Sequence, residues 1–170
     1  MATQPLSLRS SLRTVLATIR TQLATVTGLA ESRIRLVSRD PRRVPQFDGD
    51  QDILIRVGGF RADPAHRDRH DCRIMRQLHI IARTRLDLDE ADADDLWLTK
   101  DIGGSIVLEE LIIDAMQNFL PESNDGTYLF EPIRVIQGEV PQKGGQQNDW
   151  GEVELLYQLG IRLPLDQSWQ

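Results

Sequence analysis

The sequence is short of the residues and runs that mark several classes of protein. It holds one cysteine among 170 residues, so an intramolecular disulfide cannot form and packing must hold the fold. No apolar run approaches the roughly 20 residues that cross a bilayer, and polar residues interrupt the N-terminal segment where a signal peptide needs a continuous apolar core. We therefore expect a soluble protein with no membrane partner, assembled in the cytoplasm where it is made.

Motifs for common chemistries are missing too. The chain has no GxxxxGK phosphate loop, no GxSxG nucleophile elbow, no HExxH and no CxxC pair. Aromatic residues make up 5% of a chain whose net charge is −6, and no recognised nucleic-acid-binding motif is present. These absences predict a protein that is not an enzyme and holds no cofactor, and they leave a nucleic-acid-binding module as a weaker alternative.

The charges that are present divide along the chain. Residues 1–85 carry 16 arginines against 8 acids, whereas residues 86–170 carry 4 basic residues against 18 acids. Arginine suits planar, hydrogen-bonded recognition of carboxylate or phosphate. The basic half could meet nucleic acid, or it could meet the acidic half of a second copy; both signs could also intermix on one surface.

Apolar periodicity predicts the main elements. Steps of three and four residues from Leu8 to Val26 indicate a helix that Gly28 ends, and similar spacing from Ser105 indicates a second helix that Pro121 stops. Alternation indicates strands at Arg33–Ser38, at Asp52–Val57 with Gly58 and Gly59 closing it, and along the unusually long run Cys72–Leu88. On that run the even positions are apolar, and the odd positions form a row rich in arginine that we expect to be exposed.

The C-terminal third indicates a hairpin. Tyr128–Ile136 resembles a strand that Pro132 interrupts, and Glu152–Leu165 alternates again. The polar connection near 137–151 predicts a projecting arm, with Trp150 at its base. The whole order predicts one α+β domain over residues 1–170, with a mainly antiparallel sheet of about four to five strands flanked by two principal helices.

One segment gathers reactive side chains. His66 and His70 are spaced i, i+4, and Cys72 follows closely. A metal site is one interpretation, but the interleaved arginines oppose a bound cation. A Cys72 nucleophile paired with His70 is a second interpretation. Because Cys72 begins the apolar alternation of the long strand, we favour a charged turn with an inert cysteine that points to the core, and predict no metal.

An acidic run follows the long strand. An EF-hand loop starting at its first aspartate would place Ala91 and Ala93 at ligand positions and Leu98 where the bidentate glutamate belongs. That calcium site is excluded. We expect either a solvated loop or a contact with an arginine-rich neighbour, made by Asp87, Asp89, Asp92, Asp94 and Asp95.

The order of elements resembles the tail terminator proteins of long-tailed bacteriophages. The likeness spans about Leu8 to Leu165 and is carried by the stretches CRIMRQLHIIARTRL, GSIVLEELIIDAMQNFL and GEVELLYQLGIRLPL. It implies a non-enzymatic virion protein of the tail or neck: a ring, usually of six subunits, that caps the tail tube, stops its polymerisation and docks the head-tail connector or stopper. DNA would pass through its lumen without sequence-specific binding. Another neck or head-completion protein, a stopper or adaptor, is the nearest alternative.

A ring of this kind needs two different complementary patches on each subunit. The basic and acidic halves supply them, so we expect arginines of the long strand to bond acids of the next subunit. The arm is a second segment that can reach a neighbour. The expected interface residues are Arg73, Arg83, Arg85, Asp92, Asp94, Asp95, Lys143 and Trp150.

Overall fold

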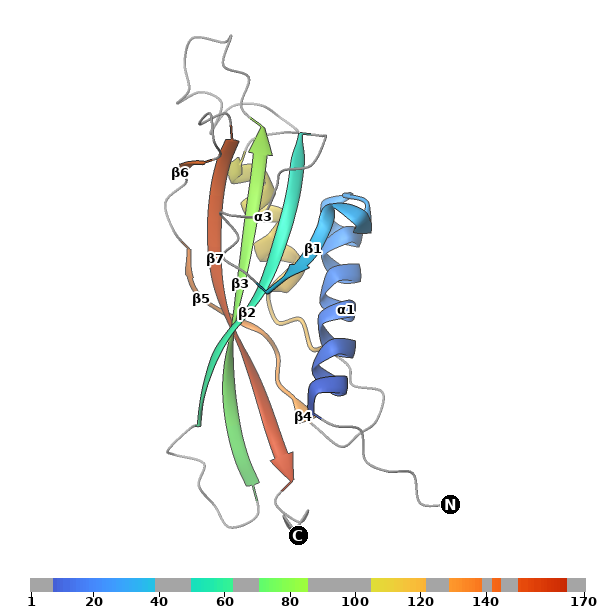
Figure 1. The fold of residues 1–170 in the computed structure, drawn as a ribbon, viewed down its shortest axis with the longest axis vertical. Helices are drawn as coiled ribbons and strands as arrows, with labels where there is room; N and C mark the ends of the chain where they lie inside the picture. The colour runs from blue at the N-terminus through green and yellow to red at the C-terminus, as the bar shows by residue number, and fades with distance from the viewer. Residues whose placement is uncertain are drawn as a thin grey trace.

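In a computed structural model of the chain, the described residues are 8–38, 50–62, 71–85, 105–121, 129–138, 142–144 and 150–164. Within them, helices α1 (Leu8–Thr27) and α3 (Ser105–Met116) lie against one face of a single twisted sheet (Figure 1). A short 3₁₀ turn, η1 (Glu31–Arg33), leads from α1 into the first strand. The predicted α+β class with two principal helices is confirmed.

Four strands lie side by side in the order β1 (Ile34–Val37), β2 (Gln51–Ala62), β3 (Asp71–Arg85) and β7 (Trp150–Pro164). Three short strands, β4 (Leu129–Phe130), β5 (Arg134–Gly138) and β6 (Gln142–Gly144), pair in turn with the outer edge of β7. The described sheet thus has seven strands in five positions, and every pairing is antiparallel except β1 with β2. A mainly antiparallel sheet is therefore confirmed.

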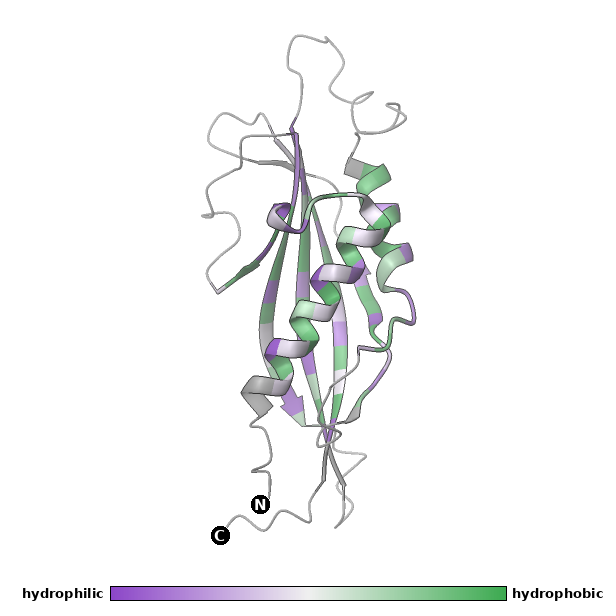
Figure 2. Ribbon diagram, turned by 90° about the vertical axis from the view of Figure 1, so that its right-hand side faces the viewer, coloured by the Kyte–Doolittle hydropathy of each residue, from purple (hydrophilic) through white to green (hydrophobic). Residues whose placement is uncertain are grey.

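Helix α1 forms because its apolar residues recur on one side. Val15, Ile19 and Leu23 are fully buried in the core, as a stripe at three- and four-residue spacing requires. Figure 2 shows apolar residues recurring along this helix among polar and intermediate ones. The helix ends where Gly28 adopts a left-handed φ of 72°, as expected for a glycine after the last helical residue.

Helix α3 packs beside α1 and ends earlier than its sequence suggests. Leu108 and Ile112 are among its buried residues, and the Gln22 side chain of α1 donates to the Ala115 carbonyl at 3.3 Å. Regular helix stops at Met116, not at Pro121, because Asn118 takes a positive φ of 59° and turns the chain. The prediction of this C-terminal end was wrong by about one turn.

The core lies between the helices and the alternate residues of the central strands. Each large apolar side chain buried there contributes about 1.5–3 kcal/mol. The even-numbered apolar face predicted for β3 is confirmed for the part whose side chains are described. The buried core residues of the two longest strands are Leu78, Ile80 and Ala82 of β3 and Val153, Leu155, Tyr157, Leu159 and Ile161 of β7.

Two glycines in β2 do not end the strand, contrary to the prediction. Pairing with β3 runs to Val57, skips, and resumes at Phe60, so two residues of β2 oppose one of β3. This is a β-bulge, which keeps the strand going while it shifts the register by one residue. Gly58 is needed at this point, since a Cβ there would lie 3.0 Å from the His79 Nε2.

The C-terminal third matches the prediction in part. Pro132 lies between β4 and β5, as expected for a residue that cannot donate to a ladder. The expected arm at 137–151 is partly built into the sheet, because residues 142–144 pair with β7 and Trp150 begins that strand. Residues 139–141 and 145–149 lie outside the described part.

Candidate functional site

The face of the sheet away from the helices is the candidate functional surface, and we call it the helix-free face. Residues paired across strands point to the same side, so the rows that alternate with the core belong to this face. From the upper to the lower end in Figure 1, the rows across β2, β3 and β7 are Asp52–Arg83–Glu152, Leu54–Ile81–Glu154, Arg56–His79–Leu156, Gln77–Gln158, Arg61–Met75–Gly160 and Arg73–Arg162.

The upper end of this face holds a buried ion pair. Asp52 is fully buried and Arg83 is 1% exposed. The Arg83 Nε donates to Asp52 Oδ1 at 2.6 Å, a second Arg83 nitrogen bonds the other carboxylate oxygen, and Arg35 reaches that same oxygen at 3.0 Å. The expectation that Arg83 is exposed is wrong, because the β2–β3 register sets Asp52 directly opposite it.

Trp150 completes this buried cluster. It is 3% exposed, and the Arg83 guanidinium carbon lies 5.8 Å from its ring centroid, within the range of a cation–π contact. Both residues are therefore engaged inside the subunit. Arg85, which pairs with Trp150 across the strands, is exposed, so it is the residue of this row left to contact a neighbour.

The middle of the face carries a histidine and carboxylate pair. His79 Nδ1 lies 2.5 Å from Glu154 Oε1, and both side chains are mostly shielded from solvent. The absence of a side chain at Gly58 leaves space for the imidazole ring. His79 is therefore tied to a neighbouring strand, in contrast to the exposed position expected from the alternation.

The lower end holds a second ionic cluster. Arg73 and Arg162 both donate to the Glu131 carboxylate, Arg162 at 3.1 Å. Burial would raise the pKa of Glu131, but the hydrogen bonds from these arginines outweigh it and hold the pKa below its usual range. A Cβ at Gly160 would overlap this carboxylate. The missing side chain at this position of β7 therefore leaves the space that the Glu131 carboxylate occupies. Arg73 is thus paired within the subunit.

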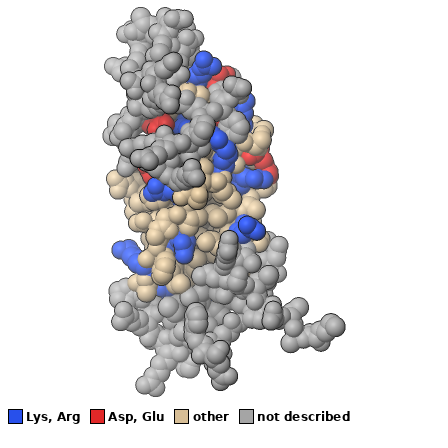
Figure 3. Space-filling view, in the orientation of Figure 1, with Lys and Arg blue, Asp and Glu red and all other residues tan. Residues whose placement is uncertain are grey.

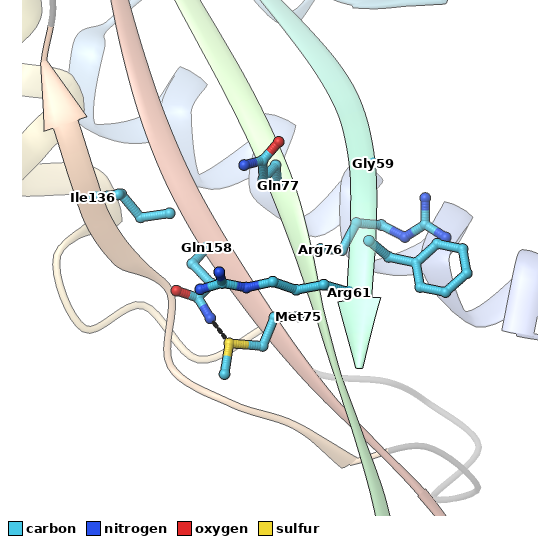
Figure 4. A pocket seen from close by; sticks show the side chains of 8 residues that line it. Gly59, Arg61, Met75, Arg76, Gln77, Ile136 and Gln158 are labelled. Atoms are coloured by element: carbon cyan, nitrogen blue, oxygen red, sulfur yellow. Dashed lines mark hydrogen bonds between the residues drawn. The ribbon is translucent and has the colours of Figure 1, made fainter. Parts of the chain in front are cut away.

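Between the two ends lies a hollow of about 340 Å³ with walls from β2, β3, β5 and β7. We call it the Phe60–Ile136 hollow, after the two exposed apolar residues at its sides, which are 64% and 48% exposed. Met75, Gln77 and Gln158 also line it, and the Gln158 amide contacts the Met75 sulfur (Figure 4).

Arginines surround this hollow. Figure 4 shows Arg61 extended across it, while Arg76 donates to the Gly58 carbonyl at 3.3 Å and lies 5.3 Å from the Phe60 ring centroid. The Nε of Arg76 is shielded from solvent and finds no hydrogen-bond partner in the described part of the chain. The lining thus combines apolar surface with cationic groups, an arrangement that suits an acidic partner with apolar side chains.

The remaining predicted site residues are not brought together by the described structure. Asp92, Asp94, Asp95, His66 and His70 lie outside the described residues. Lys143 lies in β6, and Cys72 lies in β3 opposite Leu163. For Lys143 and Cys72 the structure describes the backbone but not the side chain. The sequence reasoning missed Asp52, Glu131 and the residues of the hollow.

No candidate metal site is found within the described ranges, where groups of three His, Cys, Asp or Glu side chains do not converge. The described helices are also not long and apolar enough to cross a membrane.

Comparison with known proteins gives a likeness of fold. No family model matches the chain, and no curated protein matches its sequence. Among solved structures it is similar to a chain of the virion of a native gene transfer agent particle, with a TM-score of 0.54 and 12% sequence identity. The likeness covers 90% of this chain and 98% of that one, so the two share their fold over nearly their whole length.

Proposed function

We propose that the chain is a non-enzymatic structural protein of a phage-like virion, located in the tail or neck. The observation that carries the proposal is the fold shared with a chain of a gene transfer agent virion, which extends over 98% of that chain. Within this fold, the buried Asp52 carboxylate is shared by Arg35 and Arg83 and so joins three neighbouring strands.

The specific role we propose is that of a tail terminator. Copies of the chain form a ring, a hexamer in this proposal, that caps the finished tail tube and stops its growth. The ring then offers its other side to the head-tail connector or stopper, and DNA passes through the lumen. Two features favour a ring: the unequal charge of the two halves of the sequence, and a hollow on one face of the subunit with helices on the other.

The test is assembly with tail tubes. The full chain is purified and its mass measured by light scattering, alone and with tubes polymerised from the tube protein. A terminator forms a ring of several subunits, binds tube ends in electron micrographs, and halts further addition of tube protein. A chain that stays monomeric and leaves tube growth unchanged would contradict the proposal.

The nearest alternative is a stopper or adaptor of the neck. The order of elements in the sequence fits such a protein equally well. A stopper or adaptor would bind the head portal complex and leave the length of growing tubes unaltered, so the same tubes and purified portals separate the two roles. DNA binding that weakens steeply with salt, in the absence of tubes, would instead favour a nucleic-acid module.

A further inference from the structure

We propose that the Phe60–Ile136 hollow is the docking site for helix α3 of a second copy of this chain. This inference rests on the proposed function, since it names the contact that joins neighbouring subunits of the ring. It assigns the cationic side of the junction to Arg61 of β2 and Arg134 of β5, and the acidic side to the outward face of α3.

Two arginines at the hollow lack a negatively charged partner within the described part of the subunit. Within the described residues, Arg61 and Arg134 have no carboxylate partner, in contrast to Arg83, Arg73 and Arg162 at the two ends of the helix-free face. Arg134 pairs with Gln158, whose side chain lines the hollow, so the two point to the same side of the sheet. In Figure 3, where α3 lies behind the sheet, blue Lys and Arg atoms are spread among uncharged atoms over the lower part of the described surface.

The outward face of α3 complements this surface. Glu110 and Asp114 are four residues apart, so they lie on the same side of the helix, and both are exposed. Neither forms an ion pair with another described residue. Leu111 and Ile113 beside them are only partly buried, which leaves apolar surface next to the two acids. The other helix is less suited, because Arg13 occupies the exposed side of α1.

The size and placement of the two surfaces also fit. Helix α3 has 12 residues and is therefore about 18 Å long, enough to lie across strands spaced about 4.8 Å apart. Of the residues that line the hollow, Arg61, Met75, Gln77 and Gln158 belong to rows of the helix-free face, and α3 covers the opposite face (Figure 1). Phe60 and Arg76 pair with each other in a row of the other face, at the edge of the sheet beside the hollow. Patches on opposite faces cannot pair by a two-fold axis, so they join subunits head to tail, as a ring requires.

Pairing of strand edges is the less favoured mode of contact at this place. Strand β5 forms the outer edge beside the hollow, and all five of its residues are exposed. Its register breaks between Val135 and Gln137, which makes Ile136 the extra residue of a bulge. A bulge in a short edge strand opposes the addition of another strand, so contacts between side chains are expected instead.

Charge reversal tests the junction in the full chain. Arg61→Glu places like charges against α3 of the neighbour, and Asp114→Arg does so from the other side. Each should raise the subunit concentration at which half of the rings dissociate by roughly 10-fold or more, because like charges brought together in an interface oppose association. The double variant Arg61→Glu, Asp114→Arg should regain the wild-type mass, since each junction again holds opposite charges.

Arg13→Glu is the matched control, a reversal at an exposed arginine of α1 that should leave the mass unchanged. All the altered residues are exposed, so an unchanged thermal midpoint is expected for every variant. A ring that persists in both single variants, or a double variant as dissociated as the single ones, would overturn the docking site and leave the proposed function standing. A wild-type chain that is monomeric with and without tubes would overturn both.

Discussion

Replacing Asp52 by asparagine removes the carboxylate that two arginines share. The change keeps the shape of the side chain but leaves Arg83, 1% exposed, without its negative partner, and Arg35 without its bond to the same oxygen. Removing one member of a buried pair costs about 3–5 kcal/mol, because the remaining charge stays away from water. For a chain of this size that loss corresponds to a fall of roughly 6–20 °C in the melting temperature.

Urea and thermal unfolding of the wild type and of Asp52→Asn measure this effect. The double variant Asp52→Leu, Arg83→Met should be less destabilised than Asp52→Asn, because it removes both buried charges and fills the space with apolar atoms. Glu31→Gln is the control at an exposed pair with Arg20 and should hardly change the melting temperature. A loss below about 1 kcal/mol in Asp52→Asn would refute the reasoning, as would a double variant less stable than the single one.

Three further predictions concern carboxylates and the glycine beside one of them. Burial raises the pKa of Glu131, but hydrogen bonds from two arginines outweigh it and hold the pKa below its unfolded value. The stabilisation from Glu131 is therefore present at neutral pH and lost as the pH falls through the folded pKa, so the urea stability of Glu131→Gln should lie below wild type at pH 7, with the gap closing in acid. Burial first, and then the Glu110 charge, raise the pKa of Glu109, so wild-type stability falls as the pH rises through the interval between the unfolded and folded pKa values. The variant Glu109→Gln should therefore raise the melting temperature at neutral pH and not at acid pH. Equal gains at both pH values would contradict this cause. Gly160→Ala should cost about 1–3 kcal/mol in urea unfolding by displacing the carboxylate of Glu131, and adding Glu131→Ala should recover part of that loss; simple additivity of the two changes would rule out the contact.

The elements that follow a single period were predictable from the sequence. The apolar positions of α1 and the alternation of β3 and β7 each reflect one buried face, and that face is what the pattern reports. The pattern does not predict whether residues on the opposite face are buried. For this reason Arg83 was expected to be exposed, whereas it is buried against Asp52. Their pairing depends on the register of β2 with β3, which the bulge at Gly58 and Gly59 shifts by one residue, and the periodicity of a single strand does not contain that register.

The hollow was beyond the reach of sequence patterns for a different reason. Its side chains come from four strands that are far apart in the chain, represented by Phe60, Met75, Ile136 and Gln158. Their convergence depends on two bulges and on the register of β5, β3 and β2 with their neighbours. A glycine pair within a bulge is indistinguishable in sequence from a glycine pair that ends a strand. The sequence therefore predicts that the strand ends at Gly58 and Gly59, although it continues past them.

The bulge at Gly58 and Gly59 divides β2 into two segments with different phases. Before it, the odd-numbered Ile53, Ile55 and Val57 lie toward the helices; after it, the pairing of Arg61 with Met75 places an odd-numbered residue on the helix-free face. The first half of β2 thus packs in the core, and its second half contributes to an outer surface. Substitutions in either half then act on separate properties, folding stability for the first and subunit contact for the second, because the bulge uncouples the two alternations.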